Sequence, residues 1–291
     1  MKRIKLTLIA ALALLPVATQ AETIFGLSLG NQIFSFDSLN PTTINGLVLV
    51  SNIGADTLVD IDFYPVTGAF YGFAASGNLY RINTTTGVAT LDVTPGTSVG
   101  TVQHSDFNPM PDRARILSAG NMNFRITPSV QNPPNQQAPG TVSSDGNFVF
   151  AAGSGTGTPN LFGAAYTNNV DGTASTTLYT IDMTSLYMNS VGPQFNTLIR
   201  VGPLGITLSG FNGFDVSQSS GVAFLSNNDS LYTVNLATGT ANFLGLIGGA
   251  LGADTVAIAA VAIPEPSTYA LVGVGLLALA FAKFRRSRAQ A

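Results

Sequence analysis

Three aspartates recur in similar apolar surroundings and are the residues of this chain best suited to chemistry. Asp62, Asp106 and Asp215 each stand inside a short β-favouring run that ends near a turn. Carboxylates brought together from such runs suit a calcium ion, or acid/base chemistry on a glycan. They equally suit a structural use, in which each carboxylate caps a turn or accepts backbone amides within its own repeat. Because a catalytic pair is usually asymmetric, the repetition favours the structural use, and we assign no catalytic residue.

Two glycine-rich motifs resemble functional loops but lack the flanking structure that those loops require. Gly96–Gly100 fits the G-x-S-x-G pattern of a hydrolase nucleophile, which must be followed by a helix, yet a β-favouring run follows it. Gly153–Gly157 resembles a phosphate-binding loop, but Pro159 and another β run come next instead of a helix. With His104 as its single histidine and no cysteine, the chain has no histidine-rich metal site and lacks the usual ligands for zinc. We therefore predict no cofactor other than the calcium considered above.

A strand followed by a turn recurs along the chain and sets its organisation. Asn78–Gly87 resembles Ser230–Gly239 closely, and looser copies lie at Thr177–Asp182 and Gln32–Asp37. Apolar residues alternate in each copy, and an Asn or Asp then opens a turn. The recurring aromatic residues could line a carbohydrate-binding face, but we expect them to pack between sheets; they are Tyr80, Tyr179, Tyr232 and Phe34. Each copy is predicted to be a strand that leads into a hairpin.

The segments that carry the aspartates are each followed by another predicted strand. These following strands are Ala69–Ala74, Arg113–Ser118 and Gly221–Ser226. Together with the strand-and-turn copies they give repeat units of about four strands, which is the content of a propeller blade. The predicted complete blades are Thr57–Val93, Thr101–Ala151, Leu161–Val201 and Ile206–Gly245. Between Ser129 and Thr158 we predict one strand, Asn147–Ala151, and otherwise loops.

A fifth blade is predicted to combine strands from both ends of the body. Asp254–Ala262 would supply its first strand, because Gly252–Val256 echoes the start of the first blade at Gly54–Leu58. The other three strands would be Thr23–Leu29, Gln32–Asp37 and Ile44–Val50. This closure would pair strands that otherwise form exposed edges. In this blade Ala260 would stand where the others carry an aspartate. The fold class is therefore all-β, a five-bladed β-propeller of four-stranded blades.

The body also resembles a family of secreted bacterial domains of unknown function. The matching pieces are Asp106–Pro109 continuing through Pro111–Arg113, Ala165–Asn168, the Leu-Tyr strands and Gly202–Gly205. The resemblance spans nearly the whole body and implies a propeller-like repeat fold. It carries no established activity and no catalytic residues.

Both ends of the chain resemble protein-targeting signals. Lys2, Arg3 and Lys5 precede an apolar run from Leu6 to Ala18, which is typical of a secretory signal peptide cut after Ala21. The other end resembles the PEP-CTERM sorting signal, which a membrane enzyme called exosortase reads and cuts in Gram-negative bacteria. Its parts are Pro264-Glu265-Pro266, an apolar helix at Tyr269–Ala282, and a basic cluster with Arg285, Arg286 and Arg288. An ordinary membrane anchor is the alternative, but the helix is short for a stable span.

The predicted division is a signal peptide at residues 1–21, a propeller domain at 22–263 and a sorting segment at 264–291. That domain holds five arginines, no lysine and fourteen acidic residues, which gives a net charge of −9. A surface of this charge repels phosphate backbones and so excludes nucleic-acid binding. With no cysteine, burial and hydrogen bonding must stabilise the exported domain without disulfides.

Targeting signals lie at both ends of the chain, and the domain between them has no convincing set of catalytic residues. Together these features favour an exported, non-enzymatic protein. We expect an unprocessed form in the inner membrane, with exosortase as partner, and a mature form at the cell surface or outside the cell. Exopolysaccharide or envelope glycans are the expected ligands. One alternative is a secreted propeller enzyme that acts on a polysaccharide or small ester through the aspartates near the central channel. A calcium-stabilised scaffold is another.

Overall fold

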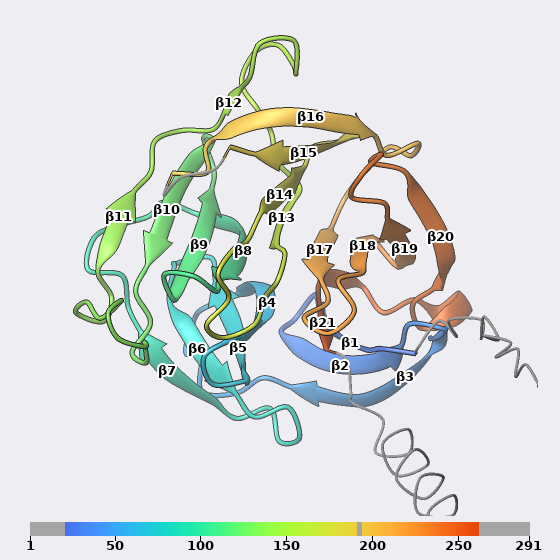
Figure 1. The fold of residues 1–291 in the computed structure, drawn as a ribbon. Helices are drawn as coiled ribbons and strands as arrows, with labels where there is room; N and C mark the ends of the chain where they lie inside the picture. Colours follow the sequence, from blue (N-terminus) through green and yellow to red (C-terminus); the bar gives the residue numbers. More distant parts are fainter. Residues whose placement is uncertain (1–20, 191–193, 262–291) are drawn as a thin grey trace, which may run out of the picture.

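Five β-sheets surround a common axis in the part of the chain described here (Figure 1). The structure is a computed structural model that describes residues 21–190 and 194–261. Within these residues no helix is long and apolar enough to span a membrane. Most of the signal peptide and all of the predicted sorting helix lie outside them.

The five sheets are the blades of a propeller, and we name each by its place. From the inner to the outer strand, the closing blade holds β21 (Thr255–Val261), β1 (Thr23–Ser28), β2 (Gln32–Asp37) and β3 (Asn40–Leu49). Blade 1 holds β4 (Leu58–Tyr64), β5 (Ala69–Ala74), β6 (Leu79–Ile82) and β7 (Ala89–Val93). Blade 2 holds β8 (Val102–Asn108), β9 (Arg113–Ser118), β10 (Met122–Ile126) and β11 (Val142–Ser144).

The remaining blades complete the ring. Blade 3 holds β13 (Gly163–Tyr166), β14 (Leu178–Ile181), β15 (Ser185–Asn189), β16 (Thr197–Pro203) and an outermost fifth strand, β12 (Val149–Phe150). Blade 4 holds β17 (Asn212–Val216), β18 (Ala223–Asn227), β19 (Ser230–Val234) and β20 (Ala241–Leu246), followed by the 3₁₀-helix η1 (Gly249–Leu251). The inner strands contact one another in the order β4, β8, β13, β17, β21 and back to β4.

The predicted five-bladed closure is confirmed. Strand β1 pairs with β21 in antiparallel register, so that Thr23 faces Val261 and the two ends of the body share one sheet (Figure 1). The predicted strands Ala69–Ala74 and Arg113–Ser118 match β5 and β9 residue for residue. The ring is thus closed by hydrogen bonds between chain ends, without a covalent link.

Two details of the predicted blades are wrong. The outer strand of blade 2 is β11, inside the stretch predicted as loop, whereas the strand predicted at Asn147–Ala151 shortens to β12 and pairs parallel with β16 of blade 3. The repeat copy at Thr177–Asp182 forms the second strand of its blade, although the other copies form third strands. The third strand of blade 3 carries a second Leu-Tyr pair, Leu186-Tyr187, which the repeat pattern cannot distinguish from the first.

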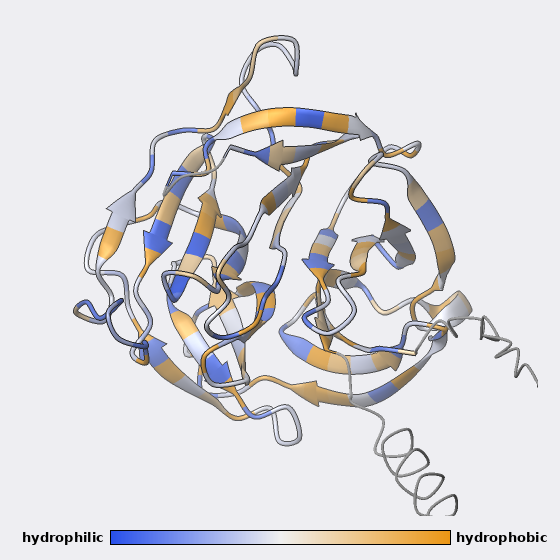
Figure 2. Cartoon of the chain, in the orientation of Figure 1, coloured by the Kyte–Doolittle hydropathy of each residue, from blue (hydrophilic) through white to orange (hydrophobic). Residues whose placement is uncertain are grey.

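A separate apolar core fills each interface between neighbouring blades. Alternation along the strands supplies these cores, because successive side chains point to opposite faces of a sheet (Figure 2). Between blades 1 and 2, for example, Tyr64 and Tyr71 pack around Phe107 with ring centroids 4.5 and 5.1 Å away. Burying one such large side chain contributes about 1.5–3 kcal/mol. The inner strands β4, β13 and β21 contribute to two cores each and are therefore held on both faces.

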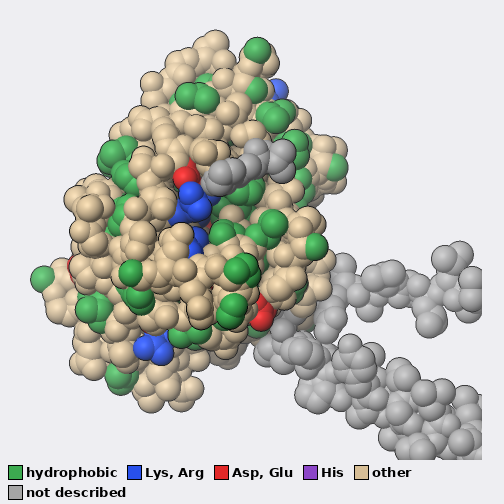
Figure 3. Space-filling view, turned by 60° about the vertical axis from the view of Figure 1, so that its left-hand side comes forward, with side chains coloured by type: hydrophobic (Ala, Val, Ile, Leu, Met, Phe, Trp, Pro, Cys, Tyr) green, Lys and Arg blue, Asp and Glu red, His purple; other side chains and the backbone are tan. Residues whose placement is uncertain are grey.

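Charged side chains are sparse on the outside of the ring. The face in Figure 3 is covered mostly by uncharged polar groups and scattered apolar side chains. Several of the acidic residues are instead buried, among them Glu22, Asp60 and the three aspartates singled out by the sequence. The interior of the ring therefore carries an unusual share of the charge-bearing groups.

Candidate functional site

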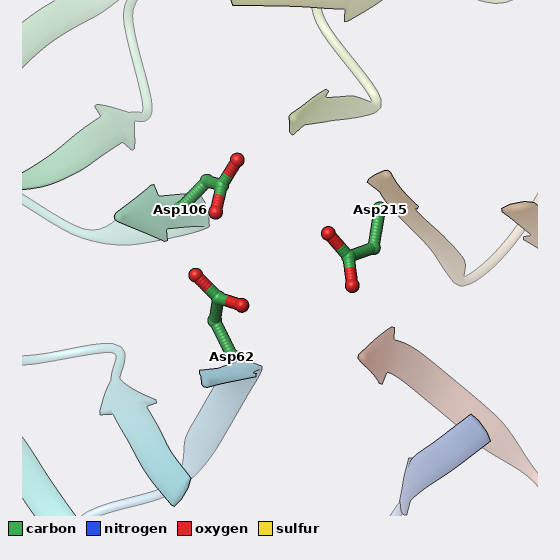
Figure 4. Close-up of side chains that lie close together, drawn as sticks. All are labelled: Asp62, Asp106 and Asp215. Atoms are coloured by element: carbon green, nitrogen blue, oxygen red, sulfur yellow. The ribbon is translucent and has the colours of Figure 1, made fainter. Parts of the chain in front are cut away.

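Asp62, Asp106 and Asp215, the aspartate trio, meet at the centre of the ring. They lie on the inner strands β4, β8 and β17, and their carboxyl groups point toward one another (Figure 4). Carboxylate oxygens from the three residues lie within 4.8 Å of one another, and all three side chains are buried. The same sequence setting in three blades places the same side chain at the same depth, because inner strands of a propeller are equivalent in position.

Each carboxylate of the trio joins two blades through backbone amides. One oxygen accepts the amide of the following residue, at 2.6 Å from Phe63, 2.7 Å from Phe107 and 2.7 Å from Val216. The other oxygen accepts an amide of the next inner strand. Asp62 takes Phe107 at 2.9 Å, Asp215 takes Ala260 at 2.6 Å, and Asp106 takes Tyr166. All six oxygens therefore serve as acceptors of backbone hydrogen bonds.

The register of these bonds corrects the expected position in the closing blade. The amide that Asp62 accepts belongs to the residue after Asp106, so the donor follows the position equivalent to aspartate. By the same register Ala260 is a donor, and Ala259 occupies the aspartate position in β21. Ala165 occupies it in β13. The ring therefore has three carboxylates and two alanines.

A fourth buried carboxylate, Asp60, lies two residues earlier on β4 and was missed by the sequence reasoning. It accepts the amide of Ile61 at 2.9 Å and that of Ser105 on β8 at 2.7 Å, which repeats the pattern of the trio one step along the channel. Its equivalent in β8 is His104. The sequence offered the signal D-x-D at 60–62, because residues two apart in a strand point to the same side.

Burial dominates the electrostatics of the cluster. Desolvation raises the pKa of Asp60, Asp62 and Asp106 above the usual range of a carboxyl group, against the lowering effect of the amides that they accept. Burial, followed by the charge of Asp62, raises the pKa of Asp215 to about 8. For Asp106, the nearby carboxyl group of Asp62 adds to the effect of burial and raises the pKa further.

Chemically, the trio could hold a cation only with oxygens that already bond backbone amides. Calcium needs six to eight oxygen ligands at about 2.3–2.6 Å, and the trio offers three carboxyl groups whose spacing permits shared contact. Acid/base catalysis requires a carboxyl group that reaches substrate. In the trio, every carboxylate oxygen already accepts a backbone amide. The three residues also have the same hydrogen-bonding pattern, so none is set apart as an acid or a base.

Tyr166 links the trio to a second buried network in blade 2. Its amide donates to Asp106, and its hydroxyl accepts from Nε of Arg115 at 2.9 Å. Arg115 is fully buried and also donates to Asp145, which pairs with Arg125 at 2.7 Å. Sequence reasoning missed this network because the partners are separated by 20 to 51 residues. It anchors the inner end of β9 against blade 3.

The two glycine-rich motifs do not form the functional loops that they resemble. Gly96–Gly100 forms part of the loop between β7 and β8, and Gly153–Gly157 forms a turn after β12; neither leads into a helix. His104 lies on β8, and burial lowers its pKa to about 4. The repeated aromatic residues belong to the interblade cores, in agreement with the expected packing role; they are Tyr80, Tyr179, Tyr232 and Phe34.

Comparison with protein families identifies both parts of the chain. Residues 32–259 match the model described as a domain of unknown function, DUF4394. Residues 262–286 match the PEP-CTERM protein-sorting motif. This motif indicates export and a precursor that exosortase sorts. The search of curated proteins found no match to the chain.

Several solved structures align with this chain at low sequence identity. A nidogen/laminin complex aligns over 83% of this chain and 98% of its own, with 12% identity and a TM-score of 0.43. An auxiliary nutrient binding protein from Bacteroides ovatus aligns over 75% and 53%, with 11% identity and a TM-score of 0.47. A protein of unknown function from Bacteroides thetaiotaomicron aligns over 78% and 59%, with 11% identity and a TM-score of 0.48. The aligned region spans little more than half the length of the two Bacteroides chains.

Proposed function

Because the chain belongs to the DUF4394 family, whose description names no activity, we propose its role from its address and its central site. The role is that of a non-enzymatic protein, exported and sorted by exosortase, which works at the cell surface or in the surrounding exopolysaccharide by binding glycans. The proposal includes removal of residues 1–21, a mature domain from Glu22 to Ile263, and removal of the C-terminal segment.

One observation carries the non-enzymatic part of the proposal. Both oxygens of every trio carboxylate accept backbone amides, half of them from the neighbouring blade. Raised pKa values are a feature of catalytic carboxyl groups, but here the cause is burial inside the ring. The carboxylates therefore serve to hold the blades together, which leaves the surface of the ring as the functional part.

The C-terminal sorting motif supports a localisation outside the cytoplasm. A sorting motif that follows the domain directly would hold the precursor at the inner membrane until exosortase cuts it. A closed ring without disulfides suits an extracellular matrix, because its stability does not depend on redox conditions.

A fractionation experiment in a host that makes exopolysaccharide tests the proposal. With exosortase present, most of the protein is expected in the exopolysaccharide fraction, and its intact mass should place the C-terminus between Pro264 and Ser267. Without exosortase, the mass should include Arg288 and the protein should stay in the membrane fraction. Mature protein found free in the medium, and not retained when exopolysaccharide is added back, would contradict the proposed glycan association.

A further inference from the structure

A pocket of about 310 Å³ lies at the mouth of the central channel, where the inner strands begin. We name it the mouth pocket. Each of the five blades contributes a residue at or next to the start of its inner strand: Val59, Val102, Phe162, Asn212 and Val256. Its volume falls within the range of about 300–1,000 Å³ that is common for small-molecule sites. No motif in the sequence pointed to it, because its walls come from five distant segments.

A smaller hollow continues from the mouth pocket toward blade 2, and we name it the side groove. Both are lined by Gln103, Asn160 and Leu161, so they form one continuous depression. The side groove extends over Ser118 and Asn121, at the turn between β9 and β10. The side groove holds only about 40 Å³, which admits a substituent but not a sugar ring, so a ligand that occupies both hollows must extend into it from the mouth pocket.

Three buried polar atoms in these walls have no hydrogen-bond partner. They are Oδ1 of Asn212 in the mouth pocket, and Oγ of Ser118 and Oδ1 of Asn121 in the side groove. Asn212 and Ser118 are each 3% exposed. Buried polar atoms are nearly always paired, and an unpaired one costs about 1–3 kcal/mol. Two of the three are pure acceptors and the third is a hydroxyl, so a ligand rich in hydroxyl donors would satisfy all of them.

The remaining walls are apolar or uncharged. Among the described residues that line the two hollows there is no Asp, Glu, Lys or Arg, and His104 is neutral above its pKa of about 4. Binding a charged ligand here would require desolvation without a counter-charge. Phe211 at the rim is 42% exposed and offers a ring face to the C–H surface of a sugar.

We propose that the mouth pocket and side groove together bind a neutral oligosaccharide across the channel entrance. The inference rests on the proposed function, since it locates the glycan site and restricts the glycan to an uncharged chain of two or more sugars. The mouth pocket takes one sugar against Phe211 and Asn212, and the chain continues across the rim with one substituent, such as a hydroxymethyl group, in the side groove beside Ser118.

Calorimetric titration of the mature protein with neutral tri- and tetrasaccharides of glucose, galactose and mannose tests the site. Ser118→Ala removes a hydroxyl that has no partner in the protein, and Phe211→Ala removes an exposed ring, so both variants should keep the melting temperature of the wild type. Each is expected to weaken binding of the best oligosaccharide by about tenfold. Phe243→Ala, at an exposed aromatic residue on the outer strand β20, is the matched control and should bind as the wild type does.

The outcomes separate this inference from the proposed function. Binding that is equal in the wild type, Ser118→Ala and Phe211→Ala would overturn the site but leave glycan association standing. The same holds if exopolysaccharide retains the protein while no neutral oligosaccharide binds, or if an oligogalacturonate binds in preference to neutral chains. Absence of binding to oligosaccharides and to exopolysaccharide alike would overturn both.

Discussion

Replacing Asp106 with alanine is expected to lower the free energy of unfolding by about 3 kcal/mol. The substitution leaves the buried amide of Tyr166 without its acceptor and removes one of the two acceptors of the Phe107 amide. An unsatisfied buried amide costs about 1–3 kcal/mol, and the hydrogen bond lost to Phe107 contributes about 0.5–1.5 kcal/mol more. In a domain of this size the loss corresponds to a fall in Tm of about 6–12 °C.

Asp37→Ala is the matched control for Asp106→Ala. Asp37 also accepts a backbone amide, that of Leu39 at 2.7 Å, but it does so at an exposed turn. Its replacement is expected to cost about 1 kcal/mol or less. Chemical denaturation of both variants measures the difference. An Asp106→Ala protein as stable as the wild type would contradict the interblade role, and loss of a glycan-cleaving activity without loss of stability would favour the enzyme alternative.

Raising the pH from about 6.5 to about 8 is expected to destabilise the domain by about 1.5 kcal/mol through Asp215 alone. The unfolded chain holds a proton on this residue only below about pH 4, whereas the folded chain holds it up to about pH 8. Between these values the folded state binds more protons, so its stability decreases as the pH rises. The acidic groups that face Asp215 are Glu22, Asp60, Asp62 and Asp106; Asp62 and Glu22 oppose its ionisation, and its charge in turn opposes that of Asp60 and Asp106.

At lower pH, His104 has the opposite effect on stability, so the measurement is made between pH 6.5 and 8. Its pKa is about 4 in the folded state and about 6.5 when unfolded, so its contribution to stability decreases as the pH falls through that range. Above about pH 6.5 the contribution of the histidine is nearly complete, so the carboxyl groups dominate the change of stability with pH. Melting curves in chelator should show a fall in Tm of about 3–6 °C between pH 6.5 and 8.

Asp215→Asn is the variant that isolates this effect, because its side chain does not titrate. Its Tm should change less than that of the wild type over the same window, while Asp37→Asn should follow the wild type. A Tm that stays level or rises in chelator would contradict the protonated state of the cluster. If added calcium raised Tm and abolished the decrease, the trio would be a cation site, as the calcium scaffold hypothesis expects.

The ring was predictable from the sequence because its signals are local and repeated. The echo of Gly54–Leu58 in Gly252–Val256 was sufficient to place β21 beside β1, and the alternation in Asn78–Gly87 was sufficient to define a strand and its turn. Strand β11 was not predictable, since three residues within a loop-like stretch carry too little periodicity. The two Leu-Tyr pairs of blade 3 are equivalent as patterns, and only pairing with neighbouring strands distinguishes them.

The candidate site was predictable only in part. Recurrence of Asp62, Asp106 and Asp215 indicated that they would approach the channel, but the amides they accept lie up to 60 residues away and depend on the register between blades. The acceptors of the side groove and mouth pocket, from Ser118 to Asn212, come together only through closure of the ring. Such long-range sites carry no local sequence signal.

The buried carboxylates bind neighbouring blades to each other through the amides that they accept. Native-state hydrogen exchange, read by NMR at the backbone amides of Phe107, Tyr166 and Ala260, tests it most directly. In the wild type these amides should exchange only through global unfolding. In Asp106→Ala, the amide of Tyr166 should exchange by local opening, at least about a hundredfold faster than in the wild type. The amide of Ala260 should still exchange only through global unfolding, at the rate set by the lower global stability of the variant. Equal protection of Tyr166 and Ala260 in that variant would contradict the claim.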